Sequence, residues 1–338
     1  MPAQNKPTKK QLSILVPVYN VSLYLNECID SILPQLTEQT ELILMNDAST
    51  DNSAEILQQY QGLENVTILH APKNGGLSVT RNELLKQACG EYIWFVDSDD
   101  VVNSGAIQEF LQYKNLDADI YLFDYIVYDE KLGKNYHKKG FLGAKKNIHT
   151  NQQDSFLKNI VKSNVYYAWN KIYKKSLIEQ CEFKAGLKFE DIYFISDICY
   201  SINTYSYINK EVIIYRVREG SIVNSLSFSY IDDYLNAFIY QVDKYRQHIN
   251  GDKQELYFYL LYKSYNRYVG LIREFDENKN KLDNNIELMQ YAYQNFNTIF
   301  DRYYQESLNN IGLFRNRTLK RNKNKVINII KKHLGVDI

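Results

Sequence analysis

Three carboxylates follow one strongly apolar stretch of the sequence. The stretch is Tyr92–Val96, and Asp97, Asp99 and Asp100 come directly after it. Carboxylates crowded together repel one another unless a cation lies between them. Oxygen ligands favour Mg²⁺ or Mn²⁺, which commonly bridge one or two carboxylates to phosphates. The run therefore predicts either a metal site for a phosphate-bearing ligand or an acidic N-cap for a helix that begins near residue 103.

A second acidic pair, Glu190 and Asp191, precedes an apolar run with helical spacing. A carboxylate at the start of a helix can point into a cleft, where it can act as a general base that takes a proton from an attacking hydroxyl. The alternative is again a helix cap, because acidic residues stabilise the first turn of a helix. Both interpretations fit the local sequence.

Two basic segments could bind phosphate. Arg81 follows Gly75-Gly76, which opens a turn before a predicted helix. Backbone N–H groups at such a turn and a nearby guanidinium suit a phosphate. Arg216, Arg218 and Ser221 form a second cluster, of two cations and a hydroxyl. The alternatives are a plain turn for the first segment and an ordinary solvated loop for the second.

Strands and helices alternate along the first part of the chain. Apolar runs predict strands at residues 12–19, 41–46, 66–70 and 92–96, and helical spacing predicts helices at 22–36, 53–60 and 77–89. This alternation is typical of an α/β domain with a mainly parallel sheet, in which ligands bind at the carboxyl ends of strands. Three of the four strands end in polar clusters: Tyr19-Asn20, Asn46–Ser49 and Asp97–Asp100.

The pattern changes along the rest of the chain. It predicts helices at residues 107–113, 154–161 and 192–201, a strand at 120–128, and long helices from 231 onward. The Ser-rich stretch Ser221–Ser229 indicates a boundary. We therefore expect a disordered tail at 1–11, an α/β domain at 12–224 and a helical region at 225–338.

The composition argues against several classes of protein. Lys plus Arg and Asp plus Glu balance at 40 each, so no overall charge attracts nucleic acid. The four cysteines lack CxxC spacing, which argues against a zinc site and favours reduced cytosolic thiols. No apolar segment resembles a secretion signal or approaches the roughly 20 residues that span a bilayer. We expect a cytoplasmic protein that is soluble or peripheral on the inner face of the cytoplasmic membrane.

Six motifs stand in order along residues 12–222. They are Ser13–Asn20, Asn46–Asp51, Asn74–Asn82, Phe95–Asp100, Trp169–Lys171 and Phe189–Asp191. In order and spacing they resemble family 2 glycosyltransferases with the GT-A fold. The resemblance implies a Rossmann-like, mainly parallel sheet of the nucleotide-diphospho-sugar transferase type, followed by a C-terminal helical region. It also implies a donor half at residues 12–100 and an acceptor half at 101–224.

The resemblance implies that the donor is a UDP-sugar. Pro17, Tyr19 and Asp47 would hold the uracil, and Arg81 would contact the nucleotide end. The family often has two acidic residues where this chain has Asn46 and Asp47; Asp47 is the one expected to read the base.

A metal ion and a diphosphate site are implied as well. Asp99 would be the principal ligand of Mn²⁺ or Mg²⁺, with Asp97 near the metal or the ribose. Tyr215–Ser221 resembles the loop that closes over the diphosphate, so Arg216, Arg218 and Ser221 would bind the donor.

In the acceptor half, Asp191 resembles the general base and Glu190 would lie beside it in the acceptor cleft. Trp169 would be either a sugar-stacking wall or a core anchor. These roles imply inverting transfer of a hexose or N-acetylhexosamine to the hydroxyl of a saccharide or lipid-linked saccharide. Such transfer serves the synthesis of bacterial polysaccharide, O-antigen or lipooligosaccharide.

Other functions fit less well. A nucleotidyltransferase would have a Gly-rich basic loop where this chain has Pro17–Asn20. The absence of a QxxRW motif and of an apolar span argues against a processive membrane-embedded synthase. A non-catalytic sugar-nucleotide or glycan-binding protein on the same fold stays an alternative.

The segment at residues 313–334 combines apolar residues with many cations. Eight Lys or Arg residues and no acidic residue stand between Arg315 and Lys332. Such a segment can lie on an anionic membrane surface. The alternatives are a solvated terminal helix and a contact with another subunit of an oligomer.

Overall fold

The computed structural model describes residues 9–141, 148–150, 156, 159–161, 163–218, 228–247 and 294. The chain divides into two compact units, Met1–Ser221 and Ile222–Ile338, and helix α8 (Phe228–Gln247) belongs to the second. Ser221, the basic segment at 313–334 and most of the predicted helix at 154–161 lie outside the described residues. Within the described ranges, no helix is long and apolar enough to cross a membrane.

The first unit opens with parallel strands and helices in alternation. The strands are β1 (Leu12–Val18), β2 (Thr40–Asn46), β3 (Val66–His70) and β4 (Tyr92–Phe95). The helices are α1 (Leu25–Ile32), the 3-10 turn η1 (Leu33–Gln35), α2 (Ser53–Gln58) and α3 (Leu77–Gln87). β1 is central and parallel to both β2 and β4, and β2 is parallel to β3. The predicted parallel α/β arrangement is confirmed, with strand bounds within one residue of those predicted.

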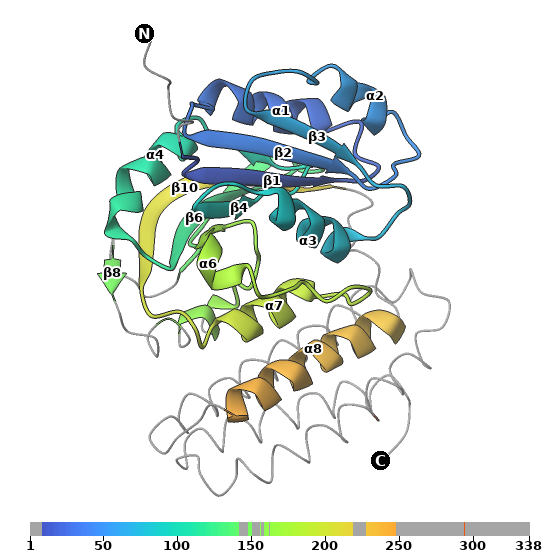
Figure 1. Cartoon of the computed structure of the whole chain (residues 1–338). Helices are drawn as coiled ribbons and strands as arrows, with labels where there is room; N and C mark the ends of the chain where they lie inside the picture. The colour runs from blue at the N-terminus through green and yellow to red at the C-terminus, as the bar shows by residue number, and fades with distance from the viewer. Residues whose placement is uncertain are drawn as a thin grey trace, which may run out of the picture. The chain divides into compact units, whose positions relative to one another are not determined.

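Helices cover both faces of these strands. α1 and α2 lie on one face and α3 on the other (Figure 1). α1 buries Leu25, Cys28, Ile29 and Ile32, whose spacing of three and four residues forms one helix face. β1 is buried along its whole length because it is covered on both faces. Each buried aliphatic side chain stabilises the fold by about 1.5–3 kcal/mol.

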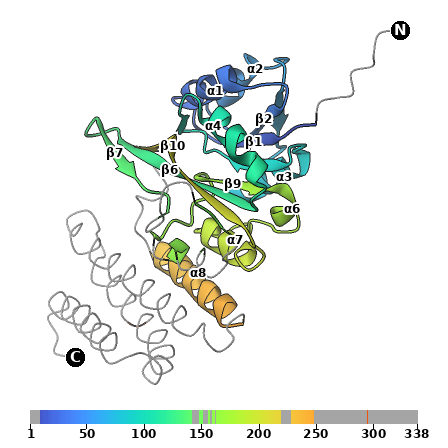
Figure 2. The same cartoon turned by 90° about the vertical axis from the view of Figure 1, so that its left-hand side faces the viewer.

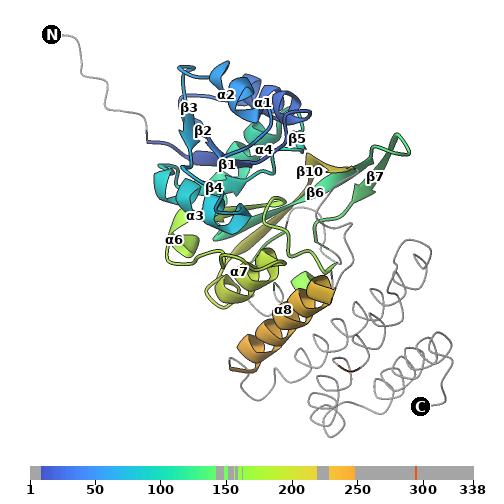
Figure 3. The ribbon, with the colours of Figure 1, turned by 90° about the vertical axis from the view of Figure 1, so that its right-hand side faces the viewer.

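The second half of the unit extends the same sheet. β9 (Lys171–Lys174) is antiparallel to β4 and to β6 (Ile120–Asp129), and β10 (Tyr205–Val217) is parallel to β6. β5 (Val101–Val102) and β8 (Ile148–Thr150) pair with β10, and β7 (Lys134–Lys138) pairs with β6. The β6–β7 hairpin projects beyond its neighbours (Figures 2 and 3). The helical elements are α4 (Ala106–Tyr113), η2 (Lys114–Leu116), α6 (Lys175–Ile178) and α7 (Glu190–Ile198).

Along its main path the described sheet has the order β3-β2-β1-β4-β9-β6-β10-β5. The strand β10 was not predicted. Its apolar pattern is broken by Asn209-Lys210-Glu211, and there the pairing with β6 shifts register, between Ile208 and Glu211. A bulge of this kind moves side chains to the opposite face and hides the period of two.

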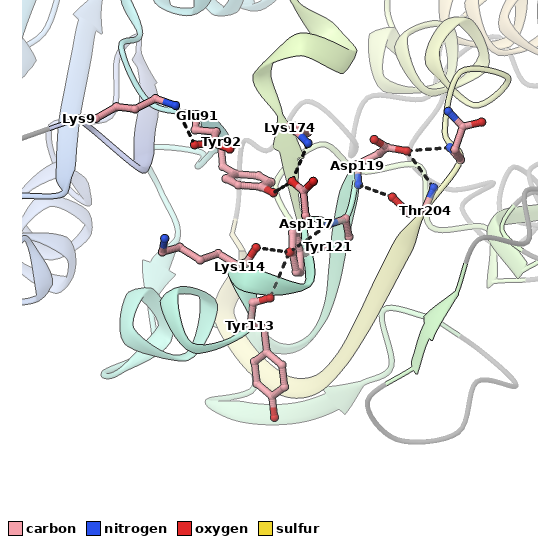
Figure 4. A network of polar contacts seen from close by, with 12 residues as sticks. Lys9, Glu91, Tyr92, Tyr113, Lys114, Asp117, Asp119, Tyr121, Lys174 and Thr204 are labelled. Atoms are coloured by element: carbon pink, nitrogen blue, oxygen red, sulfur yellow. Dashed lines mark hydrogen bonds and ion pairs between the residues drawn. The ribbon is translucent and has the colours of Figure 1, made fainter.

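A polar network ties the sheet together where β6 and β10 begin and β9 ends (Figure 4). Asp119 Oδ2 accepts hydrogen bonds from Asn203 N and Thr204 N, both at 2.8 Å. Lys174 Nζ donates to Asp117 Oδ1 at 2.6 Å. Lys174 pairs with Tyr92 at the start of β4, whereas the acidic run follows the end of β4. The network therefore lies away from the acidic run, and we assign it a role in stability.

We expect Asp119→Ala to lower the free energy of unfolding by about 1–2 kcal/mol, because two backbone amides lose their acceptor and one of them is only partly exposed. Urea unfolding measures the change. Asp119→Asn keeps one acceptor oxygen and should lose clearly less. Equal losses in the two variants would contradict the role given to these hydrogen bonds.

Candidate active site

The loops after β1 and β2 are bonded to each other. Thr50 N donates to Asn20 Oδ1 at 2.8 Å, and Ser22 N donates to Asp51 Oδ2 at 2.9 Å. Asn20 and Ala48 have left-handed backbone conformations, with φ of 51° and 54°. Non-glycine residues hold such conformations only where the surrounding structure fixes them, and they cluster at functional sites. The loops after β1 and β2 therefore form one rigid surface at the carboxyl ends of these strands, which we call the wall.

The residues predicted at the uracil lie on this wall. Pro17 is buried in β1, and Tyr19, just after it, is 46% exposed. Asp47 accepts from Gly75 N at Oδ1 and from Gly76 N at Oδ2, both at 2.8 Å. Gly76 has φ of 81°, which favours glycine. Asp47 thus holds the glycine turn against the end of β2, and its contact with uracil stays a prediction.

Arg81, in α3, bonds to three carboxylates from distant parts of the chain. Its side chain is 1% exposed. Nη2 donates to Asp97 Oδ1 at 2.8 Å, and Nη1 donates to Glu190 Oε1 at 2.9 Å and Asp191 Oδ1 at 3.1 Å. The structure thus brings the acidic strand end and the second acidic pair together. The predicted contact of Arg81 with a nucleotide would require these bonds to change and stays a prediction.

Asp191 is a half-buried carboxylate held by hydrogen bonds at both of its oxygens. Its side chain is 18% exposed, and Oδ2 accepts from Ala168 N at 3.2 Å. Burial raises the pKa of Asp191 to about 7; Arg81 opposes the rise, and the charges of Glu190 and Asp97 add to it. A carboxylate with a pKa near neutrality suits general base catalysis.

The acidic pair lies in the first turn of α7, as the helix-cap interpretation expects, although neither residue is the N-cap itself. Phe189 is the N-cap of α7, with φ of 59° and no side-chain capping bond. Glu190 and Asp191 lie in the first turn, where their carboxylates bond to Arg81 and to Ala168 N instead. The left-handed Phe189 is a further strained residue at this site.

The cap interpretation of the first acidic run is wrong. α4 begins at Ala106, and its N-cap, Gly105, has no side-chain capping bond. Asp99 Oδ2 accepts from Arg218 Nε at 2.8 Å, and the buried Asp100 accepts from Arg216 N at 2.9 Å. Burial and the neighbouring carboxylates raise the pKa of both Asp99 and Asp100, so ionising all the carboxyl groups of this turn together is unfavourable unless a cation lies nearby.

The aspartates fit one mode of metal binding. Across the described residues, no group of three or more His, Cys, Asp or Glu side chains is arranged to hold a metal ion. Mg²⁺ at a phosphate site commonly uses one or two carboxylates, with phosphates and water as its other ligands. Asp97 and Asp99 are 25% and 24% exposed, and each is bonded to an arginine through one oxygen. Two part-exposed carboxylates at an anionic turn suit that mode.

Arg216 lies in strand β10, and Arg218 is the first residue after that strand. β10 continues to Val217, so Tyr215–Val217 are strand where the sequence predicted a loop. The predicted contact of this segment with the diphosphate stays a prediction. Arg216 Nη2 pairs with Glu27 Oε2 at 2.6 Å. The guanidinium carbons of Arg216 and Arg218 each lie 5.0 Å from the centre of the Tyr24 ring. The end of β10 thus places two cations beside the acidic turn.

Trp169 occupies a core position. Its side chain is only 3% exposed, and its ring is stacked with those of Tyr167 and Tyr215. Its indole therefore has no ring face to offer to a sugar. Of the two roles considered for Trp169, the core anchor matches the structure.

Lys171 has a structural role that the sequence motif did not predict. The side chain is fully buried, and Nζ donates to Val165 O at 3.0 Å, Tyr167 O at 2.6 Å and Asn170 Oδ1 at 2.7 Å. Burial lowers the pKa of Lys171 to about 7. The four-residue strand Lys171–Lys174 begins and ends with lysine, so its sequence held no signal that Lys171 is buried.

Carboxylates and arginines thus gather at the carboxyl ends of a mainly parallel sheet, which is the edge at which α/β proteins bind their ligands. The model of glycosyl transferase family 2 matches residues 13–181. Glycosyltransferase GlyG of Streptococcus pneumoniae serotype 4 is 33% identical over 245 residues, which cover 67% of this chain and 78% of GlyG. Glycosyltransferase GlyA of the same organism is 32% identical over 225 residues, which cover 63% of this chain but only 31% of GlyA.

A solved structure has a similar fold. The crystal structure of S. aureus TarS 1-349 in complex with UDP-GlcNAc aligns with a TM-score of 0.58 at 20% identity, covering 88% of this chain and 92% of that one. The predicted GT-A class of fold is confirmed. The chain belongs to glycosyl transferase family 2.

Arg81→Met should lower the free energy of unfolding by about 3–5 kcal/mol near pH 8, because three carboxylates lose a buried cation. Without Arg81 the folded state binds protons more readily than the unfolded chain does. The loss should therefore shrink as the pH falls toward about 5, where the carboxylates become protonated. Denaturant unfolding at both pH values measures this.

Lys86→Met is the matched control on the same helix, because Lys86 pairs with Glu83 at the surface. It should leave stability nearly unchanged at both pH values. A loss in Arg81→Met that does not depend on pH would contradict the electrostatic role of Arg81.

Proposed function

We propose that this chain transfers a hexose or N-acetylhexosamine from a UDP-sugar to a saccharide hydroxyl, with inversion at the anomeric carbon. The observation that carries the proposal is the Arg81 cluster. It holds a carboxylate of raised pKa, Asp191, beside the acidic strand end at Asp97. An acceptor base and a donor-phosphate site must be neighbours in a single displacement.

The donor would lie on the wall formed by the ends of β1 and β2. Pro17 and Tyr19 would contact the uracil ring, and Asp47 would accept from its N–H while it holds the glycine turn. A carboxylate has about four acceptor positions, and two are used by Gly75 N and Gly76 N. The TarS complex with UDP-GlcNAc supports a UDP-sugar on this fold.

The diphosphate would lie between the acidic turn and the cations of β10. Asp99 would be the principal metal ligand and Asp97 the supporting one, while Arg216, Arg218 and Ser221 would bind phosphate oxygens. A bound Mn²⁺ or Mg²⁺ would offset the charge of the departing diphosphate.

Asp191 would act as the general base. The acceptor hydroxyl oxygen bonds to the anomeric carbon while the bond from that carbon to the diphosphate oxygen breaks. Asp191 takes the hydroxyl proton, and UDP leaves. A single displacement turns an α-linked donor into a β-linked product. The hydrogen bond from Ala168 N and the contact with Arg81 orient the carboxylate, and Glu190 would lie beside it in the acceptor cleft.

The acceptor would be a saccharide or a lipid-linked saccharide in bacterial polysaccharide, O-antigen or lipooligosaccharide synthesis. A cytoplasmic enzyme that is peripheral on the membrane fits such acceptors, and the basic segment at 313–334 would supply the contact. The competing function is non-catalytic binding of a sugar nucleotide or glycan. Binding alone would not require a general base, so it would not account for the raised pKa of Asp191.

Asp191→Asn tests the mechanism. The amide can still accept from Ala168 N, but it does not take up a proton near neutral pH. With UDP-hexose and UDP-N-acetylhexosamine donors, Mn²⁺ and a panel of saccharide acceptors, we expect the rate of UDP release to fall by at least about 100-fold. Calorimetry should show UDP binding within about twofold of the wild type.

Asp117→Asn is the matched control, because Asp117 is an exposed carboxylate in the network of Figure 4. It should keep wild-type turnover. Wild-type turnover in Asp191→Asn would refute the base assignment. A wild-type protein that turns over none of the donors would favour the binding function.

A further inference from the structure

Three aromatic rings form a parallel stack close to Asp191. The ring of Trp169 is stacked with those of Tyr167 and Tyr215, with ring centres 5.0 Å and 5.2 Å apart and interplanar angles of 9° and 5°. Tyr125 packs edge-on against Trp169 at 4.9 Å and against Tyr167 at 6.3 Å. Contacts on a face and on an edge hold each ring in one orientation.

The members of the stack differ in exposure. Trp169 and Tyr125 are 3% and 8% exposed, whereas Tyr167 is 39% exposed. A partly exposed tyrosine backed by buried rings is a rigid surface that loses little conformational entropy on binding. Its apolar ring and polar hydroxyl match the C–H face and the hydroxyls of a pyranose.

The backbone places this surface beside the base. Tyr167 immediately precedes Ala168, whose N–H donates to Asp191 Oδ2 at 3.2 Å. Neighbouring Cα atoms are about 3.8 Å apart, so the Tyr167 backbone lies within a few ångströms of the Asp191 carboxylate.

Lys171 fixes this segment from inside. Its Nζ donates to Tyr167 O at 2.6 Å and to Val165 O at 3.0 Å. A buried ammonium bonded to two carbonyls prevents the chain on either side of Tyr166 from moving independently. The ring of Tyr167 and the N–H that orients Asp191 are thus parts of one rigid segment.

We infer that Tyr167 forms an acceptor subsite that stacks on a pyranose ring whose hydroxyl faces Asp191. Trp169 and Tyr215 support the ring of Tyr167, and Lys171 holds its backbone. The acceptor is accordingly a cyclic sugar rather than an open-chain polyol. This inference rests on the proposed transfer to a hydroxyl and adds the class of acceptor.

The test compares Tyr167→Leu with Tyr167→Phe. The acceptor probes are methyl glycosides of glucose, galactose, N-acetylglucosamine and N-acetylgalactosamine, with ribitol and glycerol as open-chain probes. Tyr167→Leu should raise the KM for the accepted pyranoside about fivefold to tenfold, with a smaller change in kcat. Tyr167→Phe keeps the ring and should restore KM to within about twofold. UDP affinity, measured by calorimetry, should not follow this pattern.

Tyr136→Leu is the matched control, because Tyr136 is 40% exposed on β7. It should leave KM and kcat unchanged. An unchanged acceptor KM in Tyr167→Leu, or transfer to open-chain probes alone, would overturn the subsite while leaving sugar transfer intact. Absence of donor turnover by the wild type would instead overturn the proposed function, and the subsite with it.

Discussion

One buried guanidinium holds the two halves of the candidate site together. Arg81 is 1% exposed and bonds to Asp97, 16 residues away, and to Glu190 and Asp191, 109 and 110 residues away. Arginine stays charged at any relevant pH, and its planar fork fixes the directions of its partners. The turn after β4 and the start of α7 are therefore set relative to each other by one side chain in α3.

The charge balance of this cluster explains the chemistry that it can support. One cation faces three carboxylates, so the cluster remains anionic when all of them are ionised. Burial and the excess negative charge raise the pKa of Asp191, and Arg81 limits the rise. Burial and neighbouring carboxylates also raise the pKa of Asp99 and Asp100, and these two side chains accept hydrogen bonds from Arg218 Nε and Arg216 N. The proposed base and the proposed donor site would thus both depend on one electrostatic arrangement.

The sequence predicted what depends on local patterns. The four parallel strands, the polar clusters at three of their ends and the acidic motifs all follow from apolar runs and their neighbours. The bonds of Arg81 to Glu190 and Asp191 could not be predicted, because contacts across more than 100 residues leave no local signal in the sequence. β10 was missed because a bulge breaks its alternation. Trp169 was ambiguous because a buried and an exposed indole look alike in sequence; only the rings of Tyr167 and Tyr215 decide it.

The pH dependence of transfer tests the central claim most directly, since that claim is electrostatic. In a profile of kcat/KM for the acceptor, the wild type should lose activity as the pH falls below neutrality, where Asp191 becomes protonated. Removing the charge of Glu190 with Glu190→Gln should move this acidic limb to lower pH by about one unit, because a like charge beside Asp191 is lost. A limb that stays in place, or moves to higher pH, would contradict the account.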